Sequence, residues 1–222
     1  MIIGETKHTQ PRLEIKFLFS DRESVLARNI LDSIKGLYKS YNDREIHSLY
    51  FDTPQYSFAR DNLVGLSNRR KYRYRYYNED LLNGVVESKI KKNKVGIKQI
   101  FSPCRDIKQD LIFDLPNYFD QASKPLEGLS PISKITYKRA YYEYFDDIRV
   151  TLDIDIHVSS LDQTDLIAKK ADIYYPRAII EVKTSPENIE GTKEIIRMLS
   201  RSPVRHSKYL ISLATLGKLQ YL

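Results

Sequence analysis

The chain has 222 residues, with 36 Lys and Arg against 29 Asp and Glu, which gives a net charge of +7. A single cysteine, Cys104, excludes a disulfide framework and a zinc site built from several cysteines. Neither a GxGxxG nor a GxxxxGK[ST] loop is present, and no apolar stretch approaches the roughly 20 residues of a membrane helix. We therefore expect one basic domain over residues 1–222, in the cytoplasm, with an anionic partner.

Alternation with period two dominates the first half of the chain. Apolar side chains occupy every second position over residues 12–19, which predicts a strand with charges on its other face. The capping-box spacing of Ser20 and Glu23 then predicts a helix that runs to about Leu37. Further strands are expected over residues 46–51, 69–77, 85–91 and 97–101.

The second half repeats this pattern. Strands are expected over residues 135–144, 148–158 and 178–184, a short helix near 107–113, and closing helices over 187–199 and 207–219. In the strand over 148–158 the even residues are apolar, so the odd residues, from Arg149 through Asp153 and Asp155 to His157, should share the other face. About eight meandering strands with few helices predict an antiparallel α+β sheet or barrel.

Charged residues stand at alternate positions in strand after strand. One such strand is typical of a solvated outer face. If several such strands close into a barrel, their charged faces point either all outward or all inward. The inward arrangement requires that acids and bases interleave and that an anion with metal ions completes the charge balance. A polyphosphate chain with a divalent metal would need such a lining. The residues concerned are Glu14, Lys16, Arg73, Arg75, Glu87, Lys89, Arg139, Arg149, Asp153, Glu181 and Lys183.

Eight short segments in chain order resemble a known family. They are 12–16 (RLEIK), 48–54 (SLYFDTP), 71–75 (KYRYR), 87–89 (ESK), 137–141 (YKRAY), 149–153 (RVTLD), 180–183 (IEVK) and 207–209 (SKY). Together they resemble the VTC domain, the polyphosphate-polymerase branch of the triphosphate tunnel metalloenzymes in the CYTH-like superfamily, over residues 11–217. The resemblance implies an antiparallel, eight-stranded, tunnel-shaped β-barrel with flanking helices.

The resemblance also implies an activity and a site. The expected reaction moves the γ-phosphate of ATP onto a polyphosphate or pyrophosphate acceptor and releases ADP, with Mn²⁺ or Mg²⁺ as the cofactor. The implied catalytic and phosphate-binding residues are Lys16, Arg73, Arg75, Lys89, Arg139, Arg149, Lys183 and Lys208, and Lys98 is expected as a further phosphate contact. The implied metal carboxylate is Glu181, with Glu14, Glu87 and Asp153 as supporting acids.

Other interpretations of the same residues remain open. The neighbouring acid–base pairs could be simple surface ion pairs. The run from Lys71 to Tyr77 could stack and bind nucleic acid, but alternation puts its tyrosines opposite its cations, so we expect the tyrosines in the outer layer and no nucleic-acid partner. His47, His157 and His206 show no metal-ligand spacing.

Two departures from related enzymes limit the expectation. Hydrolytic tunnel enzymes begin with a Glu-x-Glu-x-Lys pattern, whereas Arg12 stands at the first acidic position here. The missing acidic residue argues against a plain triphosphatase or a cyclase but does not exclude them. The alternatives to the polymerase are therefore a triphosphatase of the same fold and a catalytically silent polyphosphate- or nucleic-acid-binding module. No regulatory helical domain or membrane helix is expected in this sequence, and a separate membrane partner stays open.

Overall fold

The computed structural model describes residues 7–8, 11–92, 95–101, 128–145, 147–161 and 171–220. The strands are β1 (Lys7–His8), β2 (Leu13–Ser20), β3 (Leu37–Asp52), β4 (Asn68–Tyr77), β5 (Val85–Lys92), β6 (Val95–Phe101), β7 (Ser130–Tyr144), β8 (Ile148–Ser160), β9 (Ile173–Tyr175) and β10 (Arg177–Thr184). The helices are α1 (Ser24–Ser33), α2 (Ser57–Val64), α4 (Lys193–Leu199) and α5 (Lys208–Thr215), with 3₁₀ turns at Asp21–Glu23, Leu81–Asn83, Pro186–Asn188 and Glu190–Thr192.

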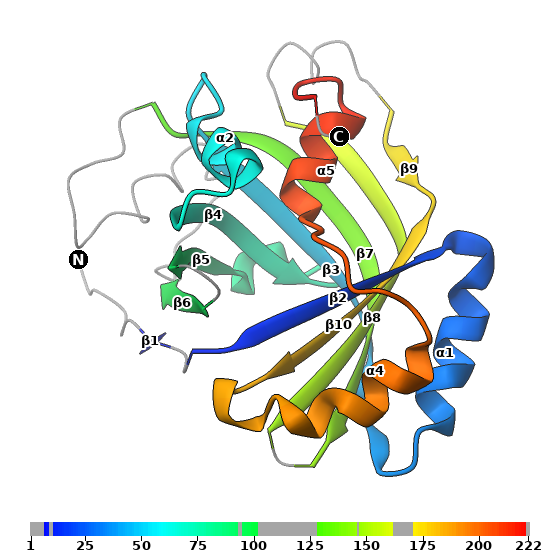
Figure 1. Cartoon of the computed structure of the whole chain (residues 1–222). Coiled ribbons are helices and arrows are strands. Elements are labelled where there is room, and N and C mark those ends of the chain that lie inside the picture. The colour runs from blue at the N-terminus through cyan, green and yellow to red at the C-terminus, as the bar shows by residue number, and fades with distance from the viewer. Residues whose placement is uncertain are drawn as a thin grey trace.

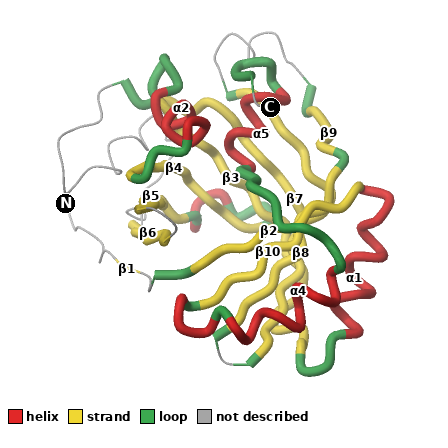
Figure 2. The backbone as a smooth tube through the Cα atoms, viewed as in Figure 1, coloured by secondary structure: helices red, strands yellow, loops and turns green. Residues whose placement is uncertain are grey.

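The strands form one curved antiparallel sheet in the order β1-β6-β5-β4-β3-β7-β8-β10-β2, and β9 pairs with β8 (Figures 1 and 2). The α+β class and the antiparallel arrangement are confirmed. The closed eight-stranded barrel is wrong, because the sheet has ten strands and its described end strands, β1 and β2, do not pair with each other.

The free edge of β2, which has no neighbouring strand within the described part of the chain, is contacted by a side chain of β5 and by the segment between α4 and α5. The Val204 N–H donates to the Lys16 carbonyl at 2.8 Å, so the segment between α4 and α5 crosses β2 there (Figure 1). Lys89 on β5 forms an ion pair with Glu14 on β2. In the strand order β2 stands at the end, next to β10, and does not pair with β5 or β6; this docking and the ion pair are contacts at that edge.

Several predicted elements are confirmed within a few residues, and others change. The strands expected over 69–77, 85–91, 148–158 and 178–184 are β4, β5, β8 and β10. The first helix ends at Ser33 rather than Leu37, because Gly36 takes a positive φ of 84° and reverses the chain into β3. α2 and β9 have no counterpart in the predictions. The helix expected near 107–113 lies outside the described residues.

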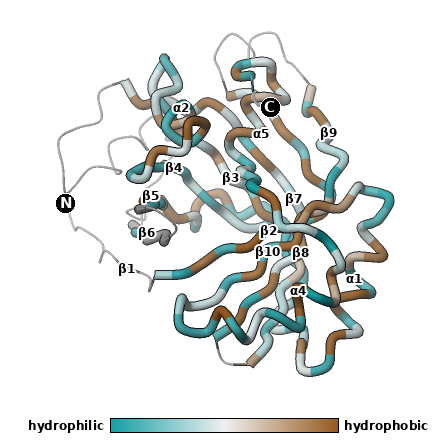
Figure 3. The backbone as a smooth tube through the Cα atoms, in the orientation of Figure 1, coloured by the Kyte–Doolittle hydropathy of each residue, from teal (hydrophilic) through white to brown (hydrophobic). Residues whose placement is uncertain are grey.

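The core lies in three clusters on the two faces of the sheet. α1 and α4 cover one face over β2, β7, β8 and β10. Tyr72, Tyr74 and Tyr76 of β4 are buried in a second cluster, where Phe58 of α2 packs on Tyr72, so the expectation for these tyrosines is confirmed. In the third cluster residues of α5 pack on residues of β3, β7, β8 and β10, and Tyr209 stacks on Tyr50 with ring centroids 5.0 Å apart. Figure 3 shows the matching alternation of hydrophobic and hydrophilic residues along the strands.

Candidate functional site

The face of the sheet opposite α1 and α4 encloses a cavity of about 630 Å³. Eleven Lys and Arg side chains and three Glu side chains line it, and they come from seven strands, from Arg12 next to β2 and from Lys208 of α5. Because successive residues of a strand face opposite sides, the alternating charges predicted from the sequence converge here. All nine predicted cations are in this lining: Lys16, Arg73, Arg75, Lys89, Lys98, Arg139, Arg149, Lys183 and Lys208.

The strand register places each predicted acid directly opposite a predicted base. Such cross-strand pairs bring opposite charges within reach of each other on one face of the sheet. The pairs are Glu181 with Lys16 and Glu14 with Lys183 between β10 and β2, Arg139 with Asp153 between β7 and β8, and Arg73 with Glu87 between β4 and β5. The cavity wall is therefore a lattice of paired charges with an excess of cations.

Asp153 holds two of these cations in place. Its carboxylate accepts from Arg139 Nε at 2.5 Å and from Arg139 Nη2 at 2.7 Å. Lys208 at the start of α5 donates to the same carboxylate at 2.5 Å. Burial raises the pKa of Asp153, but the charges of Arg139 and Lys208 outweigh it and hold this pKa well below its usual range. Both oxygens are engaged, so Asp153 orients the cations from behind the cavity wall.

Glu87 plays the same part on the other side of the cavity. It is 1% exposed and forms ion pairs with Arg73 and Lys98. Arg73 also lies 3.5 Å from the Tyr50 hydroxyl. Burial lowers the pKa of Lys98 to about 8, since the charge of Glu87 offsets only part of the desolvation. Lys98 thus loses its proton in a pH range in which the arginines of the cavity stay charged.

Raising the pH through about 8 is expected to weaken tripolyphosphate binding about tenfold, because Lys98 loses its charge and with it a charged hydrogen bond. Because the pKa of Lys98 is lowered, its positive charge strengthens tripolyphosphate binding below pH 8, and this strengthening is lost above pH 8. Dissociation constants measured between pH 7 and pH 9.5 on the wild type and on Lys98→Arg test this. The arginine variant should lose the step, and an identical step in both proteins would contradict the role of Lys98.

Three carboxylates line the cavity: Glu143, which pairs with Arg149 at the rim, and Glu181 and Glu14, which lie among lysines. Glu181 lies 3.5 Å from Lys16 Nζ and 3.3 Å from Lys183 Nζ. Burial raises the pKa of Glu181, but these lysines outweigh it and hold the carboxylate ionised. Burial and the charge of Glu181 raise the pKa of Glu14, but the charges of Lys89, Lys183 and Lys16 outweigh both and keep this carboxylate ionised too. Two ionised carboxylates suit a hard divalent cation such as Mg²⁺ or Mn²⁺, so the residues present fit the expected metal.

Two cations of the cavity have no carboxylate partner. Arg75 is 6% exposed and hydrogen-bonds to Ser48 Oγ and, at 3.0 Å, to the Tyr137 hydroxyl. Lys71 donates to Ser207 Oγ at 2.8 Å. Within the described residues, no acidic side chain lies within 4.0 Å of either one. Burial lowers the pKa of Lys71 well below its usual value, and nearby lysines lower it further. Both positions favour an incoming anion.

The sequence model of the VTC domain family matches residues 11–217. The chain belongs to the VTC domain family. A search of curated proteins finds no match to this chain. No described helix of this VTC domain is long and apolar enough to cross a membrane.

Solved structures with the same fold include proteins from three organisms. A Hippeastrum protein, provisionally an adenylyl cyclase and described as having a dominant triphosphatase activity, is 15% identical with a TM-score of 0.57 and covers 96% of this chain and 98% of its own. A Pyrococcus horikoshii OT3 protein is 17% identical with a TM-score of 0.54, and the match covers 91% of this chain and 98% of the other. A provisional adenylate cyclase of Vibrio parahaemolyticus is 12% identical with a TM-score of 0.52, and the match covers 94% of this chain and 98% of the other. The VTC domain thus shares the fold of these three structures.

The predicted residues of the VTC domain do not all lie at the same depth. Arg149 stands at the rim, with its side chain 60% exposed and 3.9 Å from Glu143. Glu87 and Asp153 lie behind the lining, whereas Glu14 and Glu181 belong to it. Lys71 was not among the predicted site residues, although it shares a strand face with Arg73 and Arg75, and this alternation is the signal that identifies it.

A smaller pocket of about 140 Å³ adjoins the cavity of the VTC domain. The two share Glu14, Lys16, Lys71, Lys89 and Ser207 in their linings. Burial and, to a smaller extent, the charges of nearby lysines lower the pKa of His206, which also lines this pocket, to about 3. His206 is therefore a neutral hydrogen-bonding group there.

Proposed function

We propose that this VTC domain is an ATP- and divalent-metal-dependent polyphosphate polymerase that acts inside the cavity. The observation that carries the proposal is the excess of cations, eleven against three glutamates, on the wall of one cavity. Two further acids, Glu87 and Asp153, lie behind that wall and still leave it strongly positive. An anion with several charges is needed to balance it, and a phosphate chain carries about one charge per unit.

The shape and donors of the cavity support a phosphate chain as that anion. Guanidinium groups bind phosphate oxygens through paired, charge-assisted hydrogen bonds. Arg73, Arg75 and Arg139 are held in fixed orientations by Glu87, Ser48 and Asp153, respectively. Because neighbours on the cavity wall pin these guanidinium groups, a bound phosphate chain meets donors that are already oriented.

The reaction needs positioning more than covalent participation by the protein. A terminal oxygen of the acceptor phosphate attacks the γ-phosphorus of ATP, the bond from that phosphorus to the bridging oxygen breaks, and ADP leaves. The cations would bind the equatorial oxygens and hold attacking and leaving oxygens in line. Glu181 and Glu14 would hold a divalent ion, which supplies neutralisation of the phosphate charge when bound.

Arg12 favours the polymerase over hydrolysis. It lines the cavity, and its Nη2 lies 3.8 Å from Asp147. A cation at this position adds an anion contact where hydrolytic relatives are expected to carry a metal carboxylate. The triphosphatase alternative is favoured by the Hippeastrum protein of the same fold, which is described as having a dominant triphosphatase activity.

Incubation with ATP and Mn²⁺, followed by separation of the products, is expected to yield ADP and a long phosphate polymer. ADP or orthophosphate without polymer would instead identify the triphosphatase. Binding of polyphosphate without turnover would leave a binding module. A preparation carrying Arg73→Ala serves as the control for contaminating kinases, because it should lose the polymer product.

A further inference from the structure

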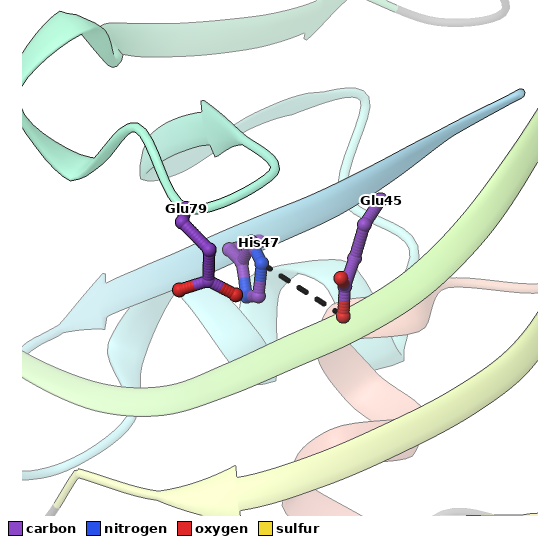
Figure 4. Close-up of side chains that lie close together, drawn as sticks. All are labelled: Glu45, His47 and Glu79. Atoms are coloured by element: carbon purple, nitrogen blue, oxygen red, sulfur yellow. Dashed lines mark ion pairs between the residues drawn. The ribbon is translucent and has the colours of Figure 1, made fainter. Parts of the chain in front are cut away.

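A second cluster of potential metal ligands lies on the face of β3 that points away from the cavity. Glu45 and His47 stand two residues apart on β3, and Glu79 follows β4 (Figure 4). One ligand atom from each residue lies within 4.8 Å of the other two, and His47 Nε2 is 3.9 Å from Glu45 Oε1. Ser48, the next residue, contacts the cavity residue Arg75, so the sheet separates this cluster from the proposed phosphate site.

His47 is the residue that points to a ligand. It is 6% exposed, and its Nε2 atom has no hydrogen-bond partner among the residues that the structure describes. Its Nδ1 atom lies 3.2 Å from Thr136 Oγ1, and its ring stacks on Tyr76 with centroids 4.5 Å apart. Buried polar atoms are nearly always partnered. A ring that is fixed through Nδ1 and leaves Nε2 free has the arrangement of a metal-binding histidine.

The local backbone brings the second glutamate to this histidine. Asn78 adopts a left-handed conformation with φ of 52°, which turns the chain after β4. The Asn78 N–H donates to the Glu45 carbonyl at 2.9 Å, and Asn78 Oδ1 accepts from the Glu45 N–H at 3.3 Å. Glu45 and Glu79 are therefore held near each other across the strand end, although two carboxylates repel without a cation.

We propose that Glu45, His47 and Glu79 bind a zinc ion on the outer face of the sheet. One imidazole nitrogen and two carboxylate oxygens form a donor set that suits Zn²⁺, with water in the fourth position. Ligands of a tetrahedral zinc lie about 3.4 Å apart. The exposed Glu79 side chain can rotate to close the remaining separation. Such an ion joins β3 to the segment after β4 and stabilises that corner of the sheet.

Equilibrium dialysis with zinc tests the site, with excess Mg²⁺ present to occupy the cavity carboxylates. The wild type and Glu181→Gln are each expected to bind one zinc equivalent at this cluster. His47→Gln should lose that equivalent, and Glu79→Gln, at an exposed position, should weaken it at least tenfold. Added zinc should raise the melting temperature of the wild type and leave that of His47→Gln unchanged.

His157→Gln is the matched control. His157 also pairs with a carboxylate, that of Asp155 at 3.0 Å, but among the described residues this pair has no third potential metal ligand beside it. It is expected to keep the zinc equivalent. If His47→Gln fails to fold, Glu79→Gln decides the question alone. Zinc binding that both variants leave unchanged, or no zinc equivalent in the Glu181→Gln protein, would overturn the proposal.

Discussion

Glu181→Gln is expected to lower the rate of ATP turnover by about 10²–10³-fold or more, while the cavity still binds polyphosphate. Glu181 lies on the cavity wall between Lys16 and Lys183. The neighbouring lysines keep the carboxylate ionised, so at neutral pH it is ready to bind a divalent cation. Glutamine keeps the size of the side chain but removes the charge that holds such an ion.

The two halves of this prediction need separate measurements. Turnover is measured as ADP and polymer formed from ATP over a range of Mn²⁺ concentrations, and binding is measured with tripolyphosphate in the absence of metal. Removing one negative charge beside two lysines should leave binding equal or tighter. Glu190→Gln, at a glutamate whose side chain is 73% exposed and pairs with Lys193, is the control and should keep full activity. Turnover in Glu181→Gln within twofold of the wild type would refute the metal role.

Most of the proposed site could be predicted because strand alternation is a local property. In β4, β5, β10 and β2 the register is regular, so residues two apart share a face along the whole strand. The pattern therefore predicts which charged side chains share a face of a strand, and the family resemblance implies that this face is turned inward. It could not tell which of them lie on the surface of the wall and which behind it, since that depends on the pairing of Asp153 and Glu87 with cations from other strands.

β8 shows where alternation fails. Arg149, Asp153, Asp155 and His157 were expected on one face, and this is wrong for the last two. The register shifts between Thr136 and Lys138, where β7 pairs with β8, and Asp155 takes a positive φ of 55°. This bulge reverses the faces. Asp155 consequently binds Lys138 and His157 on the outer side rather than any cavity residue.

The open edge of the sheet and the outer histidine cluster depend on contacts that no local pattern encodes. β2 is bridged by a segment about 190 residues later in the chain, through Val204 and through the His206 carbonyl that accepts from Lys16 at 3.0 Å. Likewise, Glu79 approaches His47 only because Asn78 turns the chain back. Such long-range docking is decided by the whole fold. The strand pattern therefore leaves a sheet or a barrel open, the closed barrel is implied only by the family resemblance, and the spacing of the histidines predicts no metal site.

Asp153→Asn is expected to lower the free energy of unfolding by about 3–5 kcal/mol, because it leaves two buried cations without their carboxylate. Arg139 is 6% exposed and Lys208 has a side chain that is 13% exposed, so water cannot replace the lost charge well. Urea denaturation of the wild type and the variant measures this loss. Asp155→Asn is the matched control on the same strand, since its ion pair with Lys138 is exposed and is worth less than about 1 kcal/mol.

Anion binding should reverse much of this loss. Arg139 and Lys208 face the cavity, so a phosphate chain supplies the negative charge that the asparagine lacks. Tripolyphosphate at 100 times its dissociation constant stabilises a folded protein by about 2.7 kcal/mol, and the variant should reach this effect at a lower concentration than the wild type. Tripolyphosphate that stabilises Asp153→Asn less than the wild type would show that these cations do not face the bound anion. The excess of positive charge on the cavity wall thus has two effects: it destabilises the fold when the Asp153 carboxylate is removed, and it selects a polyanion as the ligand.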